Sequence, residues 1–458
     1  MINFGTDNNN NRLVPQAISI KSIEIDNYKT AARQTRFGFK SQSTADITDI
    51  VAKASISESI YSPTLKLKLG IKDSINFLES FPITGHEVIR VQLEQKSPYQ
   101  SEDYNSLLTF YVTDYPTFGK GENESVQVYT IEAISEHAYI SGFKKISRSY
   151  KNPPVEEIES IILNDLEVDS KDFVTAGQDI SKSKGVINIQ TPLSAVEFLR
   201  KNMYDSNGTP FFLFQILDRS INLISLSKLV DEKSNPSYST YYDFRNSVAA
   251  DPNGAEAYDE MRRRIVDVSS NLKLAKYAQG RNGAFASENN FLDWSNKSYS
   301  TILYNYLDDV NTSTSAIENN HVLTPLFRVF NTSLNKLPSS NQSYISKNDE
   351  AFPEDINYGS SSQFGSHYIK AHHSLLDTIT HDIKLHGDIN LNAGRIITLK
   401  FPKAIDPQAK RDLDMPESEL YDETLSGKYL ITSCIHEVED GEYFCNLRVK
   451  RDSFSVGF

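Results

Sequence analysis

The residues most able to do chemistry in this sequence are its nine histidines, five of which fall in one short stretch. These five are His367, His372, His373, His381 and His386. Imidazole is a common zinc ligand, so such a set could hold a metal ion. His381 and His386 lie five positions apart in an expected strand, however, and residues so spaced point to opposite faces. We therefore interpret the five as solvent-facing polar residues near a domain junction and predict no metal site.

The two cysteines, Cys434 and Cys445, lie on the two strands of an expected hairpin near the end of the chain. If the Asp-Gly pair between them forms the turn, Cys434 faces Leu447 and Cys445 faces His436. The sulfurs then share a face but are offset diagonally, which is a poor placement for a disulfide. We expect two free thiols, as in a protein made in a cytosol.

Other motifs that suggest chemistry lack the residues around them that the chemistry needs. The "HEVED" of 436–440 has no second histidine and sits in an expected strand, unlike a metalloprotease helix. The "GRNGAF" of 280–285 has no lysine partner, so we interpret it as a turn rather than a phosphate loop. No serine lies in a G-x-S-x-G sequence.

The acidic and basic clusters also favour structural interpretations. The pairs Glu156/Glu157 and Glu437/Glu439 have no apolar surroundings that would raise the pKa of one carboxyl above the other, so we expect solvated faces. The basic run Arg262–Arg264 is interpreted as helix surface or as a docking contact for an acidic partner. The sequence thus predicts no catalytic, cofactor-binding or metal-binding residue, and no enzyme.

The composition describes an acidic, β-rich protein of 458 residues with a net charge of -13. Gripping nucleic acid by its phosphates needs a basic surface, so we expect no sequence-specific nucleic-acid binding. The start of the chain has no features of a secretory signal, and no run of about 18 apolar residues predicts a membrane segment.

Hydrophobic patterning predicts a mainly β protein with an α+β insertion, divided into five segments. These are a flexible N-terminal arm (1–15), a first β domain (16–145), an α+β domain (146–235), an irregular insertion (236–365) and a second β domain (366–458).

Helices and turns are expected at specific places in the two middle segments. One helix follows the prolines at 153–154, and a second begins at Thr191 as N-cap with Pro192 in its first turn. In the insertion we expect a helix through Ile265, Val268, Leu272 and Ala275, a hairpin around Ser295–Lys297 and long Ser/Asn-rich loops.

The two β segments share a weak internal repeat. "GHEVIRVQL" (85–93) resembles "GRIITLKF" (394–401), and each is followed by a polar excursion and then by strand, turn and strand. Such a repeat predicts two related domains in one chain.

Four stretches of the chain, taken in the order in which they occur, resemble the baseplate central hub proteins of contractile-tailed bacteriophages. That family is similar in fold to the first part of type VI secretion spike proteins. The resemblance rests on "TPLSAVEFL" (191–199), "FFLFQILDRSINLISLSKL" (211–229), "SNKSYSTILYNYLDD" (295–309) and "GKYLITSCIHEVEDGEYFCNLRVKRDSF" (427–454).

The resemblance implies a homotrimer in which each chain carries two β-barrel-like tube domains, giving a pseudo-sixfold ring. Such a hub joins the sixfold tail tube to the threefold central spike and forms a channel for DNA. The implied partners are the central spike protein, a tail tube or tube-initiator protein and baseplate wedge proteins. The implied location is the tail baseplate of the virion, after synthesis in the bacterial host cytoplasm. No wall-cutting domain is recognisable in the chain.

Two alternatives remain open on the sequence. The tail-tip hub of a non-contractile phage, or of a phage-derived secretion system, would have the same ring geometry. A carbohydrate-binding or glycan-cleaving β protein would need aromatic platforms and two carboxylates at hydrolytic spacing. The chain has one tryptophan, Trp294, beside Asp293.

Overall fold

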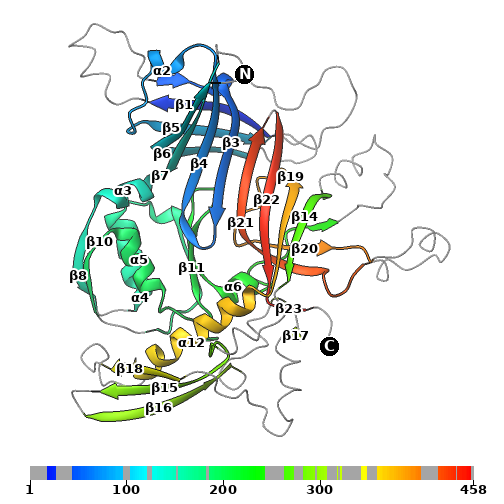
Figure 1. Cartoon of the computed structure of the whole chain (residues 1–458). Helices are drawn as coiled ribbons and strands as arrows, with labels where there is room; N and C mark the ends of the chain where they lie inside the picture. The colour runs from blue at the N-terminus through cyan, green and yellow to red at the C-terminus, as the bar shows by residue number, and fades with distance from the viewer. Residues whose placement is uncertain are drawn as a thin grey trace, which may run out of the picture.

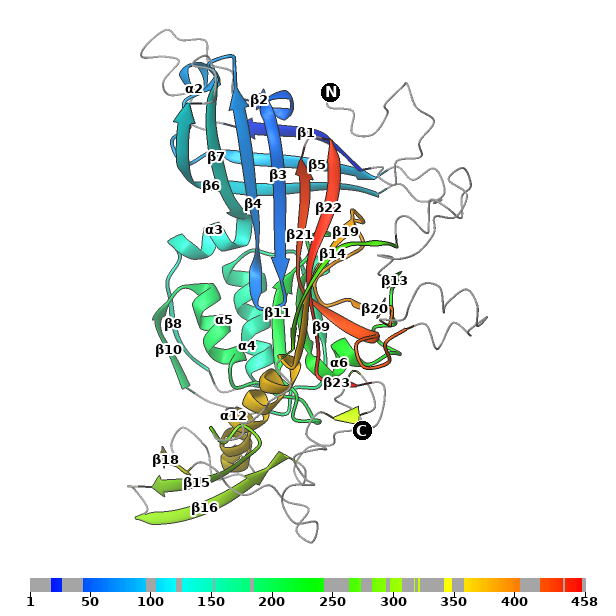
Figure 2. The same cartoon turned by 45° about the vertical axis from the view of Figure 1, so that its right-hand side comes forward.

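The fold is known from a computed structural model of the whole chain (Figures 1 and 2). It describes residues 18–26, 44–95, 104–120, 126–150, 153–181, 185–242, 263–272, 282–293, 297–306, 317, 320–321, 342–347, 358–403, 421–439 and 441–454. The predicted N-terminal arm, Trp294 and most of the Ser/Asn-rich loops lie outside these residues.

One antiparallel sheet dominates the molecule and confirms the mainly β fold. Its strand order is β14-β19-β22-β21-β3-β4-β7-β6-β5-β1-β2, with β13 and β20 attached beside β21. The strands from the first part of the chain are β1 (Ile18–Asp26), β2 (Thr44–Asp46), β3 (Val51–Ser59), β4 (Ser62–Asp73), β5 (Val88–Gln95), β6 (Tyr104–Lys120) and β7 (Gln127–Ser135). The later ones are β13 (Thr240–Tyr242), β14 (Ile265–Leu272), β19 (Ile379–His386), β20 (Ile396–Lys400), β21 (Gly427–Glu439) and β22 (Glu442–Arg451).

The same five-strand arrangement occurs twice in this sheet. In each unit the strands lie in the order first, second, fifth, fourth, third, and all neighbours are antiparallel. The first unit is β3-β4-β7-β6-β5 and the second is β14-β19-β22-β21-β20. The fourth strand is bulged in both units, at Val112/Asp114 in β6 and at Ile431/Ser433 in β21. A bulge bends a strand. The first part of β6 or β21 therefore pairs with the third strand of its unit, which crosses the others, and the second part pairs with the fifth strand (Figure 1).

Alternating side chains place a single core behind both units. In β4, for example, Leu65, Leu67, Leu69 and Ile71 are at most 1% exposed, while the lysines between them face outward. One contiguous cluster of buried residues includes side chains from β1 through β7 and from β19 through β22. The two units therefore share one core.

An α+β unit lies below the first β unit in Figure 1. Its elements are α3 (Glu136–Phe143), β8 (Ile146–Tyr150), α4 (Pro154–Ser160), the π-helical turn η2 (Ile161–Asp165), β9 (Phe173–Ala176), β10 (Gly185–Gln190), α5 (Pro192–Arg200), β11 (Phe211–Gln215), β12 (Ile221–Ser225) and α6 (Leu226–Val230). Both predicted helices are confirmed, and the Thr191 hydroxyl caps α5 by accepting a hydrogen bond from Ser194 N at 3.4 Å.

One prediction for the insertion is corrected by the structure. The expected helix through Ile265, Val268 and Leu272 is strand β14, because this β-branched stretch finds a partner in β19. Arg263 and Arg264 therefore precede a strand and are not helix surface, and Ala275 lies outside the described residues.

Helix α12 (Tyr358–Leu376) spans residue 366, and its Ala371 and Leu375 are buried together with Tyr304 and Tyr306. The predicted hairpin is confirmed as β15 (Ala286–Asp293) paired with β16 (Ser298–Asn305), joined by β18 (Gln342–Lys347). A short pair is formed by β17 (Asn320–His321) and β23 (Ser453–Phe454).

Candidate functional site

The seam between the two five-strand units joins segments that lie far apart in the chain. Strand β3 of the first unit pairs antiparallel with the second half of β21, from Ser433 opposite Ser59 to Glu439 opposite Lys53. This pairing makes two similar units into one continuous wall.

Ion pairs on the outer face hold the seam in register. The Lys53 ammonium lies 2.9 Å from Glu439 Oε2 and also contacts Glu437 Oε1. Hydrogen bonds to these two carboxylates raise the pKa of Lys53. Glu437 further accepts a hydrogen bond from Asn446 Nδ2 at 2.7 Å. The carboxylates predicted to be a solvated face thus fix two strands against each other.

The inner face of the seam carries a buried polar cluster of Glu58, Cys434, His436, Tyr443 and Cys445, all at most 4% exposed. His436 Nε2 lies 2.9 Å from Glu58 Oε1 and 3.2 Å from Cys434 Sγ. The other ring nitrogen, Nδ1, lies 2.6 Å from the Tyr443 hydroxyl and 3.5 Å from Cys445 Sγ.

The predicted register of the hairpin is confirmed, with Cys434 opposite Leu447 and Cys445 opposite His436. Both thiols are free and buried. Gly387 leaves room for the Tyr443 ring, because a Cβ atom at position 387 would overlap that ring.

Burial and charge act against each other within this cluster. Burial alone would lower the pKa of His436, but the charges and hydrogen bonds of Cys445 and Glu58 outweigh it and raise the pKa to about 10. Burial likewise would raise the pKa of Cys445, but hydrogen bonding with Cys434 and the charge of His436 lower it well below the usual range. The pKa shifts of His436 and Cys445 thus favour an imidazolium beside a thiolate, whereas burial raises the pKa of Glu58 and of Cys434 and favours their protonated forms.

The five histidines between 367 and 386 do not form a site, and their predicted exposure to solvent is wrong for two of them. His372 and His381 are 2% and 0% exposed. Aromatic rings surround the set, as Tyr429 lies edge-on to His381 with ring centres 5.1 Å apart. The prediction that His381 and His386 face opposite sides is confirmed by the alternating burial of β19. The histidine of the buried cluster at the seam is instead His436. The sequence placed it opposite Cys445 but gave no sign of its contact with Glu58.

Two of the remaining motifs are as the sequence predicted, whereas Glu157 forms an ion pair in place of a solvated face. His436–Glu439 belong to strand β21 and not to a helix. Asn282–Phe285 form a turn in which Gly283 has a φ of 73°. Glu157 is engaged by Arg148, whose Nε donates to its Oε1 at 2.6 Å.

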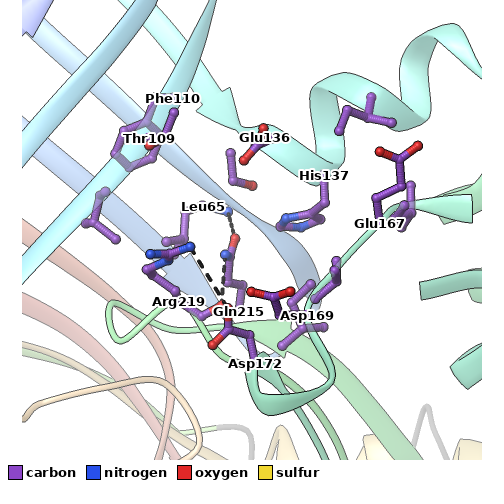
Figure 3. Close-up of a pocket in the computed structure, with 16 residues that line it drawn as sticks. Leu65, Thr109, Phe110, Glu136, His137, Glu167, Asp169, Asp172, Gln215 and Arg219 are labelled. Carbon is purple, nitrogen blue, oxygen red and sulfur yellow. Dashed lines mark hydrogen bonds and ion pairs between the residues drawn. The ribbon is translucent and has the colours of Figure 1, made fainter. Parts of the chain in front are cut away.

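A polar pocket of about 250 Å³ separates the first β unit from the α+β unit (Figure 3). On one side Leu65 N donates to Gln215 Oε1 at 3.4 Å, and Arg219 Nη2 lies 3.9 Å from Asp172 Oδ2. On the other side His137 Nε2 donates to the Pro63 carbonyl at 2.6 Å, and burial lowers its pKa. A neutral histidine held by a main-chain carbonyl fastens α3 to the sheet.

Comparisons with solved structures identify the fold. The tail protein from Neisseria meningitidis MC58 matches with a TM-score of 0.50 and 10% identity, over 97% of this chain and 100% of that chain. The 43 kDa tail protein of prophage MuSo2 from Shewanella oneidensis gives 0.47 and 11%, over 95% and 100%. An E. coli component of the type VI secretion system gives 0.41 and 9%, over 89% and 75%. No protein-family model and no curated protein sequence matches the chain.

This chain has the fold of the Neisseria tail protein. At 10% identity to the Neisseria tail protein the likeness concerns the fold, which runs through almost the whole of both chains. The resemblance read from the sequence is confirmed at that level. Within the described residues no helix of this tail-protein fold is long and apolar enough to cross a membrane.

Proposed function

We propose that this protein is a trimeric hub of a phage tail baseplate, which joins a sixfold tail tube to a threefold central spike. The two five-strand units are its tube domains. The first lies within 16–145, and the second combines β14 of the insertion with the strands of 366–458. Three chains with two units each give a ring of six similar wall segments. The observation that carries the proposal is the repeated strand order together with the seam that joins the two copies.

The seam supplies a pattern for contacts between chains. Within one chain, the first strand of one unit (β3) pairs with the second half of the fourth strand of the other (β21). The equivalent strands still available are β14 and the second half of β6. β14 ends the described strand order, and β5 pairs with β6 only as far as Tyr111. A head-to-tail contact of β14 with β6 of the next chain would repeat the seam until the ring closes.

The surface of β14 supports its use as an interface. Its exposed side chains include Val266 and Leu272, which are 46% and 44% exposed. Edge strands of monomeric proteins are usually protected by charges, prolines or a covering element, because an open edge recruits another strand. Two exposed apolar side chains on an edge strand are therefore consistent with β14 being covered by another chain in the assembly.

The acidic composition fits a ring through which DNA passes. A net charge of -13 repels a polyanion and would keep DNA from binding the wall during ejection. We propose no catalytic activity, a location in the virion, and contacts with the central spike, a tube or tube-initiator protein and wedge proteins. A tail tip of a non-contractile phage or of a phage-derived secretion system would use the same ring.

The interface is tested by charge substitution on β14. The double variant Val266→Lys/Leu272→Lys should elute as a monomer in gel filtration with light scattering, with unchanged circular dichroism. A matched control, Val186→Lys/Ile189→Lys, changes two apolar residues of β10 that are 63% and 68% exposed and should remain trimeric. Each protein is measured alone and together with a candidate central-spike protein. A β14 variant that still forms trimers would refute the proposed contact.

A further inference from the structure

Three potential metal ligands converge on the inner face of the seam. Cys434 and His436 are two apart on β21 and so point to the same side, and Cys445 lies directly opposite His436 on β22. One ligand atom of each residue lies within 4.8 Å of the others. Among the described residues, this is the one group of three or more cysteine, histidine or carboxylate side chains that meets this spacing.

A fourth donor comes from the other five-strand unit. Glu58 on β3 is opposite Cys434 in the register, and its Oε1 lies 2.9 Å from His436 Nε2. Its second oxygen, Oε2, accepts a hydrogen bond from Ala393 N at 3.1 Å, which fixes the carboxylate plane. Two sulfurs, one nitrogen and one oxygen are donors that zinc accepts in closed, four-coordinate structural sites.

We propose that Cys434, His436, Cys445 and Glu58 bind one zinc ion, which fastens the two five-strand units together across the seam. His436 would ligate through Nε2, the nitrogen that faces both Cys434 and Glu58. The Cys445 thiol, which lies 3.5 Å from Nδ1, would turn toward the ion as it binds. Its Nδ1–H would then donate to the Tyr443 hydroxyl at 2.6 Å, the kind of outer hydrogen bond that orients a metal-bound imidazole. Binding requires the thiols and the imidazole to release their protons, which pass to solvent as the ion enters during folding.

The sequence predicted no metal, because it considered the cysteine pair and the histidines between 367 and 386. The set proposed here adds His436 and also Glu58, which is 378 positions from His436 in the chain. A bound ion would hold three second-unit ligands against one first-unit ligand.

The test is elemental analysis of the full chain, purified without a histidine tag and refolded with zinc. We expect about one zinc per chain after dialysis, and a loss of at least about tenfold in Cys445→Ser and Glu58→Gln. Ser433→Ala, the neighbour of Cys434 on the opposite face of β21, should keep its zinc. Cobalt refolded into the wild-type chain should give thiolate-to-cobalt absorption, which does not depend on a variant folding.

Three results would overturn the proposal. Wild-type protein refolded with excess zinc could hold less than about a tenth of an ion per chain. Its cobalt form could lack thiolate absorption. Alkylation in denaturant with a chelator could find no free thiols, which would mean that Cys434 and Cys445 form a disulfide. Two free thiols in that assay are expected from a zinc site.

Discussion

Truncating Ile56 should destabilise both five-strand units by the same amount. Ile56 lies on β3 opposite His436, is 4% exposed and belongs to the shared core. Ile56→Ala removes three carbons, each worth about 0.8 kcal/mol when buried. Ile56 also borders a cavity of about 20 Å³, so the truncation enlarges existing space. We therefore expect a loss of about 3–4 kcal/mol, within the range for such core substitutions.

Native-state hydrogen exchange measures this loss separately in each unit. At one fixed protein concentration, the free energy of opening should fall equally in β4 and in β22, because the two strands belong to one sheet with one core. The control Ile75→Ala removes a side chain that is 68% exposed and should change either value by less than about 0.5 kcal/mol. If β4 loses protection while β22 keeps it, the units fold independently and the reasoning about the seam is wrong.

Three further predictions concern stability, assembly and activity. Burial and then the charge of Arg451 lower the pKa of His381 to about 4, below its unfolded value of 6.5. The free energy of unfolding is therefore highest above about pH 6.5 and falls by up to about 3 kcal/mol as the pH approaches 4, because the unfolded chain binds the proton more tightly. In His381→Gln the denaturant midpoint should depend less on pH across that range. Deleting the chain from Lys428 onward removes β21 and β22 and should abolish trimers in light scattering, whereas trimers without the hairpin would contradict the account. The purified chain should not clear cell-wall suspensions, and clearing lost on substitution of a single Asp or Glu would show that it is an enzyme.

Local patterns predicted most of the strands, two of the helices of the α+β unit and the final hairpin. Alternation in "TLKLKLGI" and the Thr191-Pro192 start of α5 are determined by neighbouring residues, so they are readable along the chain. The stretch around Ile265 was wrongly predicted to be a helix, because its apolar spacing also fits one. Its strand structure is determined by pairing with β19, more than 100 positions away in the chain.

The cluster at the seam was only half visible in the sequence. The spacing of Cys434, His436 and Cys445 in a hairpin already placed three polar groups on one face. Glu58 joins them through the β3–β21 pairing, which is a tertiary contact with no local sign. The histidines near residue 372 drew attention instead, yet their rings pack against aromatic side chains.

The ring is tested most directly by single-particle images of the full chain bound to its spike partner. The account predicts a particle with three copies of the 51.7 kDa chain, six similar wall segments and an open centre. Strand β14 of each chain should lie beside β6 of the next. A dimer, a hexamer, or a trimer with a filled centre would contradict it.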